Sequence, residues 1–121
     1  MSERYVVCKD EEIRPGEMRT IAVGKRELPV VVVRTGAGSL HAIYGRCPHQ
    51  GAPLIAGRLI AETVGTLPGE VACIRDGEIL QCPWHAFEYD VTSGRAVTDP
   101  DNLRIRCYDV ALEGGEVVVT V

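Results

Sequence analysis

Short apolar segments separated by turn-forming residues run through most of the chain. The segment Met18–Val23 alternates loosely between apolar and polar positions, and Leu40–Tyr44 is similarly short. Between them lies Pro29–Thr35, a run of β-branched residues that predicts a well-buried strand. Runs of about four to eight such residues bounded by glycine and proline are typical of strands. The pattern therefore predicts an all-β fold.

A turn signal in the middle of the chain predicts a tight hairpin. Asp76 and Gly77 lie between two apolar segments, Val71–Arg75 and Glu78–Gln81. An Asp-Gly pair readily adopts the positive φ angles that a two-residue hairpin loop requires. We expect the two flanking segments to pair with each other.

Two further segments complete the expected elements. Leu103–Leu112 and Glu116–Val121 flank Gly114-Gly115, which predicts a second hairpin near the end of the chain. The best helix candidate is Arg58–Val64, which has glycine on both sides and only marginal length.

The size and charge of the chain limit its possible partners. Its 121 residues are the length of one domain, residues 1–121, with a net charge of −4. No basic cluster is present to meet phosphates, which argues against nucleic acid. The longest apolar run, Val30–Val33, is far shorter than the roughly 18 residues of a membrane span, and the N-terminus shows no export signal. We expect a cytoplasmic protein that contacts neither nucleic acid nor membrane.

The five cysteines fall into two groups. Cys47 and Cys82 each have a histidine close behind them, and the other three do not. An odd cysteine count without an export signal fits poorly with a disulfide framework. His41, the third histidine, has no partner at a ligand spacing and is expected to be structural. We expect small core residues at the remaining cysteines, Cys8, Cys73 and Cys107.

Two short segments carry the candidate chemistry. CPHQGAPL begins at Cys47 and CPWHAFEYD begins at Cys82, so each segment offers one thiolate and one imidazole, from His49 and His85. Two sulfur and two nitrogen donors suit either a zinc ion or an iron–sulfur cluster. Structural zinc sites commonly use CxxC and HxxxH pairs, and this chain has neither at the two segments.

The spacing of the donors suits a mixed iron–sulfur cluster better. In that cluster one iron takes two thiolates and the other takes two imidazoles, so each loop must give one ligand to each iron. Pro48 and Pro83 follow the two cysteines, restrict φ and lack an N–H group, which leaves neighbouring N–H groups available to the sulfurs. Gly51 is expected to allow a close backbone approach to the cluster.

Together the two segments resemble the signature of the Rieske 2Fe–2S proteins. The resemblance extends through IRPGEM, PVVVVRTG, LHAIYGRCPH and the closing strands, which is most of the chain. It implies a Rieske fold, in which an antiparallel β-sandwich-like base carries a small cluster-binding subdomain at about residues 45–95. It also implies one 2Fe–2S cluster per chain, with Cys47 and Cys82 on one iron and His49 and His85 on the other through Nδ1.

Several departures from the family pattern narrow the subtype. Rieske proteins of cytochrome bc complexes join their loops by a disulfide where this chain has Ala52 and Trp84, and they carry a serine where it has Phe87. The absence of the disulfide and of the serine favours a reduction potential near the lower end of the roughly −150 to +300 mV range of Rieske centres. Tyr89 would raise the potential a little if its hydroxyl reached the Cys82 sulfur. An ordinary, partly buried tyrosine is the alternative.

The segment Leu54–Val71 is longer than its counterpart in compact Rieske ferredoxins. One interpretation is a hairpin or short helix beside the cluster that shapes a partner surface. The other is a surface insertion that the fold tolerates.

The resemblance implies one-electron transfer without catalysis. We expect a ferredoxin that takes an electron from a flavoprotein or ferredoxin reductase and passes it to an oxygenase component. We expect no second, catalytic domain of a terminal oxygenase within these 121 residues. Two alternatives stay open: the small subunit of an assimilatory nitrite reductase, and a structural zinc-binding module for protein interaction.

Overall fold

Two antiparallel β-sheets make up most of the fold. The computed structural model describes residues 3–48, 51–64, 72–83 and 87–121, with the side chains of residues 62–64 and 72–76 left out. Its elements are β1 Arg4–Lys9, η1 Asp10–Glu12, β2 Met18–Val23, β3 Leu28–Arg34, β4 Leu40–Tyr44, η2 Leu54–Ala56, β5 Arg58–Val64, β6 Ala72–Gln81, β7 Glu88–Asp90, β8 Cys107–Glu113 and β9 Glu116–Thr120. The all-β prediction is confirmed. No helix among these described residues has the length and apolar character that crossing a membrane requires.

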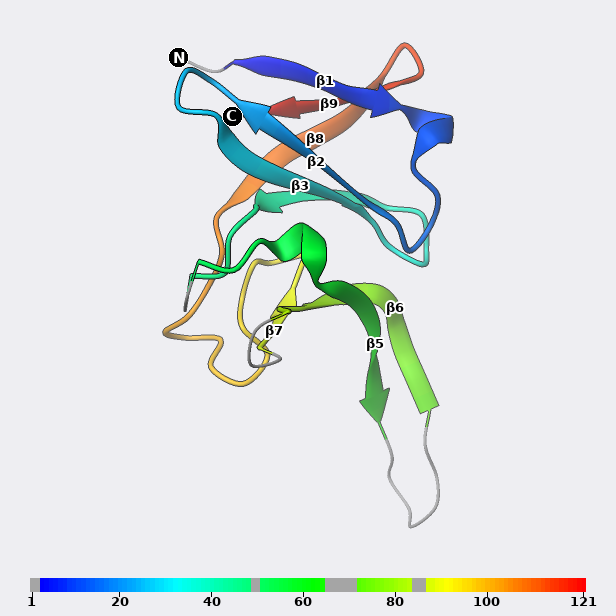
Figure 1. The fold of residues 1–121 in the computed structure, drawn as a ribbon. Helices are drawn as coiled ribbons and strands as arrows, with labels where there is room; N and C mark the ends of the chain where they lie inside the picture. Colours follow the sequence, from blue (N-terminus) through cyan, green and yellow to red (C-terminus); the bar gives the residue numbers. More distant parts are fainter. Residues whose placement is uncertain (1–2, 49–50, 65–71, 84–86) are drawn as a thin grey trace.

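The larger sheet forms a base on which the smaller sheet sits (Figure 1). Its strand order is β1-β9-β8-β4-β3-β2, and the smaller sheet has the order β5-β6-β7. The β5–β6 hairpin projects away from the rest of the molecule (Figure 1). Both chain ends lie on the base, where the backbones of Glu3 and Val121 hydrogen-bond to each other.

Strand β3 faces two different cores. Val30 and Val32 point into one core and Val31 and Val33 into the other, because successive side chains of a strand point to opposite faces. The base core contains Ile13, Val23, Val30, Val32, Ala42, Val117 and Val119. The loop core contains Val31, Val33, Ile43, Cys47, Ala52, Leu54, Leu80, Cys82, Tyr89, Val91, Ala96 and Ile105. This double burial explains the unbroken apolar run in the sequence.

The closing hairpin is confirmed, but its first strand starts later than predicted. Strand β8 begins at Cys107 rather than at Leu103. The preceding residues serve the loop core instead, since Ile105 is buried there and its N–H donates to the carbonyl of Gly94. A Cβ on Gly94 would lie 2.2 Å from the Ile105 carbonyl oxygen, so only glycine permits this crossing.

The helix predicted at Arg58–Val64 is wrong, since this segment is strand β5. It pairs antiparallel with β6, from Arg58 opposite Gln81 to Val64 opposite Ala72. A partner strand satisfies its backbone groups all along this length. Tertiary pairing therefore overrides the weak helical preference of a short segment.

The hairpin turn predicted at Asp76-Gly77 is also wrong. These residues lie inside β6, where the pairing register with β5 jumps from Ile79 to Ile74. Gly77 has a φ of +71°, and a Cβ there would lie 2.8 Å from the Gly36 nitrogen. Gly77 is therefore part of a bulge that lies against the β3–β4 turn of the base. It is not part of a turn between neighbouring strands.

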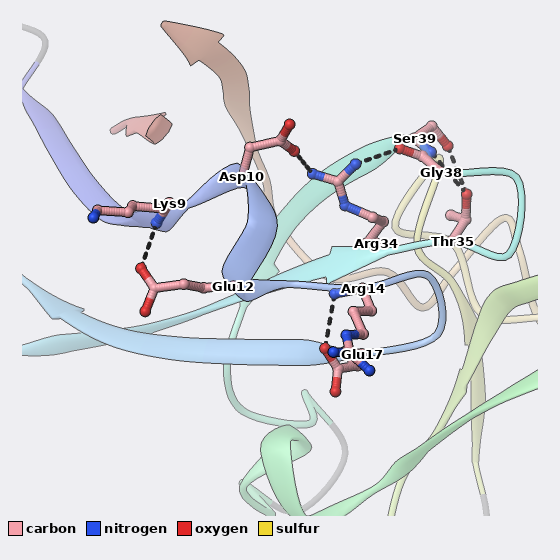
Figure 2. A network of polar contacts seen from close by, with 9 residues as sticks. All are labelled: Lys9, Asp10, Glu12, Arg14, Glu17, Arg34, Thr35, Gly38 and Ser39. Carbon is pink, nitrogen blue, oxygen red and sulfur yellow. Dashed lines mark hydrogen bonds and ion pairs between the residues drawn. The ribbon is translucent and has the colours of Figure 1, made fainter. Parts of the chain in front are cut away.

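A polar network holds the β3–β4 turn that Gly77 contacts (Figure 2). The Arg34 guanidinium bonds the Asp10 carboxylate of η1 and donates to the Gly38 carbonyl at 3.2 Å. Buried Thr35 places its hydroxyl 2.7 Å from that of Ser39 across the turn. The bulge of the smaller sheet therefore contacts a turn of the base that side-chain hydrogen bonds hold in place.

Candidate metal centre

The two Cys/His loops are closed by the same backbone hydrogen bond. The Cys47 N–H donates to the carbonyl of Ala52 at 2.9 Å, and the Cys82 N–H donates to that of Phe87 at 2.7 Å. In both loops the acceptor lies five residues after the cysteine. The two similar sequence segments therefore also share a backbone hydrogen bond. The N–H groups of the residues that follow Pro48 and Pro83 lie outside the described residues, so their expected bonds to the sulfurs stay a prediction.

The first loop is anchored to the end of β4. Leu54 donates its N–H to the carbonyl of Gly45 at 2.9 Å, and Gly51 donates to that of Cys47 at 2.7 Å. Gly51 has a φ of +73°, and no described protein atom lies within 4 Å of where its Cβ would be. Within the protein itself, this glycine is required by its backbone angle rather than by crowding.

The second loop is held between β6 and β7. Gln81, directly before Cys82, pairs with Glu88 on one side and Arg58 on the other. A Cβ on Gly57 would lie 2.2 Å from the Gln81 carbonyl oxygen, so the end of the first loop presses against the start of the second. The sequence segments that carry the ligands are therefore locked together through the smaller sheet.

The sulfurs of Cys47 and Cys82 lie in the same core. The two cysteines are 2% and 3% exposed, and the described residues buried with them are aliphatic side chains and Tyr89. A thiolate buried in such surroundings would be costly without a positive partner, and a bound metal ion supplies one. The described donors thus fit a buried, sulfur-ligated iron site.

Tyr89 places its hydroxyl 3.1 Å from the Cys47 sulfur. The sequence pattern suggested the sulfur of Cys82, so that expectation is corrected to the cysteine of the first loop. Tyr89 is fully buried, which excludes the partly buried alternative. Burial, followed by the hydrogen bond to Cys47, raises the pKa of Tyr89 well above its usual value. The hydroxyl therefore keeps its proton and can donate it to a thiolate.

The remaining predicted site residues are only partly described. His49, His85 and Trp84 lie outside the described residues, so their expected roles stay predictions. Pro48 and Pro83 are exposed, at the outer side of the two loops. Leu54 is fully buried in the same core as the two cysteines.

The other cysteines differ from the expected set of core residues. Cys107 is exposed, which contradicts the prediction, because the phase of β8 points it away from the base core. Cys8 is half-buried and packs against the base core, and the side chain of Cys73 is outside the description. His41 sits on β4 with its Nε2 3.3 Å from the Ser39 hydroxyl, and burial lowers its pKa.

Comparison with known proteins identifies the family. The Rieske [2Fe-2S] domain matches residues 3–109. Ferredoxin CarAc of Metapseudomonas resinovorans is 27% identical over 114 residues, which is 93% of this chain and 89% of the ferredoxin. The chain spans only 16% of the length of other curated relatives, the mouse and human apoptosis-inducing factor 3.

Solved structures share the same fold. The ferredoxin of carbazole 1,9a-dioxygenase from Nocardioides aromaticivorans IC177 is 28% identical, with a TM-score of 0.72 over 96% of this chain and 95% of the other. An NADH-dependent nitrite reductase small subunit from Mycobacterium tuberculosis has a TM-score of 0.76 over 100% and 96% of the chains at 19% identity, which shows the fold alone. The family match decides between zinc and iron for the donor set. The chain belongs to the Rieske [2Fe-2S] domain family, and its cofactor is a Rieske-type 2Fe–2S cluster.

Proposed function

We propose that this chain is a one-electron carrier that is not itself an enzyme, and that Cys47, His49, Cys82 and His85 hold its cluster. Bound there, the cluster takes up one electron and releases it again. The observation that carries the proposal is the pair of buried sulfurs in two identically closed loops, with a phenolic donor beside one of them.

The chain's own residues prepare the site for this role. Tyr89 holds a proton toward the Cys47 sulfur, which favours the more negative, reduced state. Leu54 and Phe87 pack beside the sulfurs and limit the access of water. Few groups need to move when the charge changes, because both loops are braced by backbone hydrogen bonds.

The relatives indicate the class of partner. CarAc is named a ferredoxin, and the Nocardioides protein is the ferredoxin of a dioxygenase. We therefore take a flavoprotein or ferredoxin reductase as the donor and an oxygenase component as the acceptor. The proposal treats residues 1–121 as a single domain with its cluster-binding part at about 45–95, working in the cytoplasm. A role in nitrite reductase is supported by likeness of fold alone.

Spectroscopy and metal analysis of the purified chain test this proposal. We expect two iron atoms and two acid-labile sulfides per chain, visible absorption, and reversible reduction by one electron. His85→Cys should lower the midpoint potential toward the about −400 mV of clusters with four cysteine ligands, because a thiolate replaces a neutral ring. His41→Gln serves as the control and should leave both the absorption and the midpoint unchanged.

Two results would contradict the proposal. A colourless sample that contains zinc would remove the electron-transfer role. An unchanged midpoint in a folded, iron-loaded His85→Cys variant would remove that histidine from the ligand set.

A further inference from the structure

Each ligand cysteine has an arginine as a close neighbour. Arg46 directly precedes Cys47 in the chain. Arg58 lies across the sheet from Gln81, which directly precedes Cys82. The sequence alone does not link the two arginines, because Arg58 comes near Cys82 through strand pairing.

Both arginines are exposed and held in place without losing their charge. Arg46 donates to the Gly51 carbonyl at 3.1 Å, and Arg58 donates from Nε to the Gln81 side-chain oxygen at 3.1 Å. These acceptors are neutral. Within the described part of the chain, the ion pairs of arginine involve Arg4 and Arg34, so Arg46 and Arg58 remain uncompensated cations.

The charge around the loops is opposite in sign to that of the whole chain. Residues 45–61 and 79–87 contain these two arginines and no Asp or Glu, whereas the chain carries −4 overall. Glu88, opposite Gln81 on β7, is the first carboxylate beyond the second loop, and it lies two strands from Arg58. The other carboxylates nearest in sequence are Glu62 and Glu78, each directly outside these two ranges.

Exposed apolar side chains accompany the two cations. Pro48 and Pro83 lie directly after the ligand cysteines, and Pro53 and Ile55 follow in the first loop, with Ile55 38% exposed. Pro53 also pairs with Arg46 through an isolated bridge, which places apolar and basic groups next to each other. An apolar centre with a charged rim is the usual composition of a protein contact surface. We call this set of six residues the basic tip: Arg46, Pro48, Pro53, Ile55, Arg58 and Pro83.

We infer that the basic tip docks a partner surface that bears carboxylates around an apolar centre. This inference rests on the proposed function, because it concerns the surface through which the electron passes. Charge complementarity steers encounter and suppresses wrong partners, and it acts locally when salt screens distant charges. The acidic remainder of the molecule would repel the same partner, which orients the encounter toward the loops.

Small redox ions test the sign of the electrostatic potential at the surface through which the electron leaves the protein. The reduced, loaded protein gives one electron either to hexacyanoferrate(III) or to hexaammineruthenium(III), and stopped-flow absorbance follows the rate. Salt is varied between about 0.1 M and 1 M, where the Debye length falls from about 10 Å to about 3 Å, so that only nearby charges count. We expect the rate with the anion to fall about threefold and the rate with the cation to rise.

Charge-reversal variants assign the effect to the two arginines. Arg46→Glu/Arg58→Glu should invert the salt dependence with the anion. Lys9→Glu/Lys25→Glu makes the same change in total charge with exposed lysines of the base and should leave it as in the wild type. Glu88→Gln should raise the rate with the anion. The visible spectrum of each variant verifies that the cluster is loaded.

A measurement without electron transfer provides an independent test. The redox-inert ion hexacyanochromate(III) is paramagnetic, and it should broaden the Nε–H NMR signals of Arg46 and Arg58 before those of Arg14 and Arg19 on the base. Earlier broadening at the base would overturn the inference. So would an anion rate that rises with salt, or equal effects of the two double variants. Failure of the loaded protein to exchange electrons with either ion would instead overturn the proposed function.

Discussion

The base core and the loop core meet at one strand, yet they differ in chemistry. The buried residues of the base core are all aliphatic, and strands of the larger sheet supply most of them. The loop core adds two thiols and a phenol to its aliphatic residues, and loops supply much of its wall. A purely apolar core can be stable on its own, whereas a core that contains ligand sulfurs gains stability when metal binds. The comparison suggests that the base provides stability and the loops provide chemistry.

Removing iron should produce the largest difference in stability between the two cores. We expect hydrogen-exchange protection of the loop amides of Cys47 and Cys82 to fall by at least about 1,000-fold, or about 4 kcal/mol, when iron is chelated. Amides of β3 and β9 that serve the base core should keep most of their protection. NMR-detected exchange measures both regions in one sample. A uniform loss in both cores would show that they form one cooperative unit.

The contact between the bulge in β6 and the base provides the second test. Gly77→Ala combines a positive φ with a clash 2.8 Å from the Gly36 nitrogen, so it should cost about 3 kcal/mol. Gly16→Ala is the matched control, because Gly16 has a φ of +86° and open space around it, and it should cost about 1.5 kcal/mol. Urea unfolding measures both. Equal costs would mean that the contact can relax.

Neighbouring valines of β3 separate the cores at a single strand. Val31→Ala and Val32→Ala each remove two fully buried methyl groups and should each cost about 2 kcal/mol in the loaded protein. We expect the cost of Val32→Ala to be the same without iron. The cost of Val31→Ala should shrink without iron, because its core is then less ordered. Unfolding curves of both variants, with and without iron, test this, and identical iron dependence would contradict the division.

Tyr89→Phe tests the polar part of the loop core. Removing a hydrogen bond of about 1 kcal/mol from the reduced state should lower the midpoint by about 40 mV for one electron. The pKa of Tyr89 is raised by burial and by its bond to Cys47, so the hydroxyl stays protonated as pH rises. The difference in midpoint between variant and wild type should therefore stay constant from about pH 6 to pH 9. Voltammetry that shows the difference vanishing would remove Tyr89 as a donor.

The smallest expected effect belongs to His41, which lies on the same face of β4 as Ile43 of the loop core. Burial lowers the pKa of His41, although Glu78 and Asp90 oppose this shift. The unfolded chain then binds more protons than the folded one, so this contribution to stability is complete above about pH 6.5 and is lost as pH falls. His41→Gln should flatten the acid side of the stability profile. Thermal unfolding measured from about pH 5 to pH 8 would contradict this if both proteins lost stability equally.

The sequence predicted those features that depend on neighbouring residues. The β-branched run of β3 and the glycine pair before β9 act locally, so their elements were found. Residue types and spacing predicted Cys47 and Cys82 as ligands, and the structure places both cysteines in one core, while their ligand role stays a prediction. The two histidines stay predictions, since they lie outside the described residues.

Features that depend on distant residues were missed or mistaken. Strand β5 was expected to be a helix, because its pairing partner lies beyond a long connection. Asp76-Gly77 has the composition of a hairpin turn, yet glycine is required at position 77 because the backbone there lies close to the base. Likewise, which cysteine Tyr89 reaches depends on how the two loops come together. In each case the local signal fits more than one structure, and a partner that is distant in sequence decides which one forms.

The bulge in β6 divides the β5–β6 hairpin into two parts with different structural roles. The root, where Arg58 and Gln81 pair, directly precedes Cys82, a proposed iron ligand, and the backbone at Gly77 approaches the base. Beyond the bulge, the described residues Glu62–Val64 of β5 pair with Ala72–Ile74 of β6. Residues there could be trimmed, extended or fused to a reporter peptide while the ligands keep their positions. The outer hairpin is therefore a natural attachment point for engineering, with the redox unit left intact.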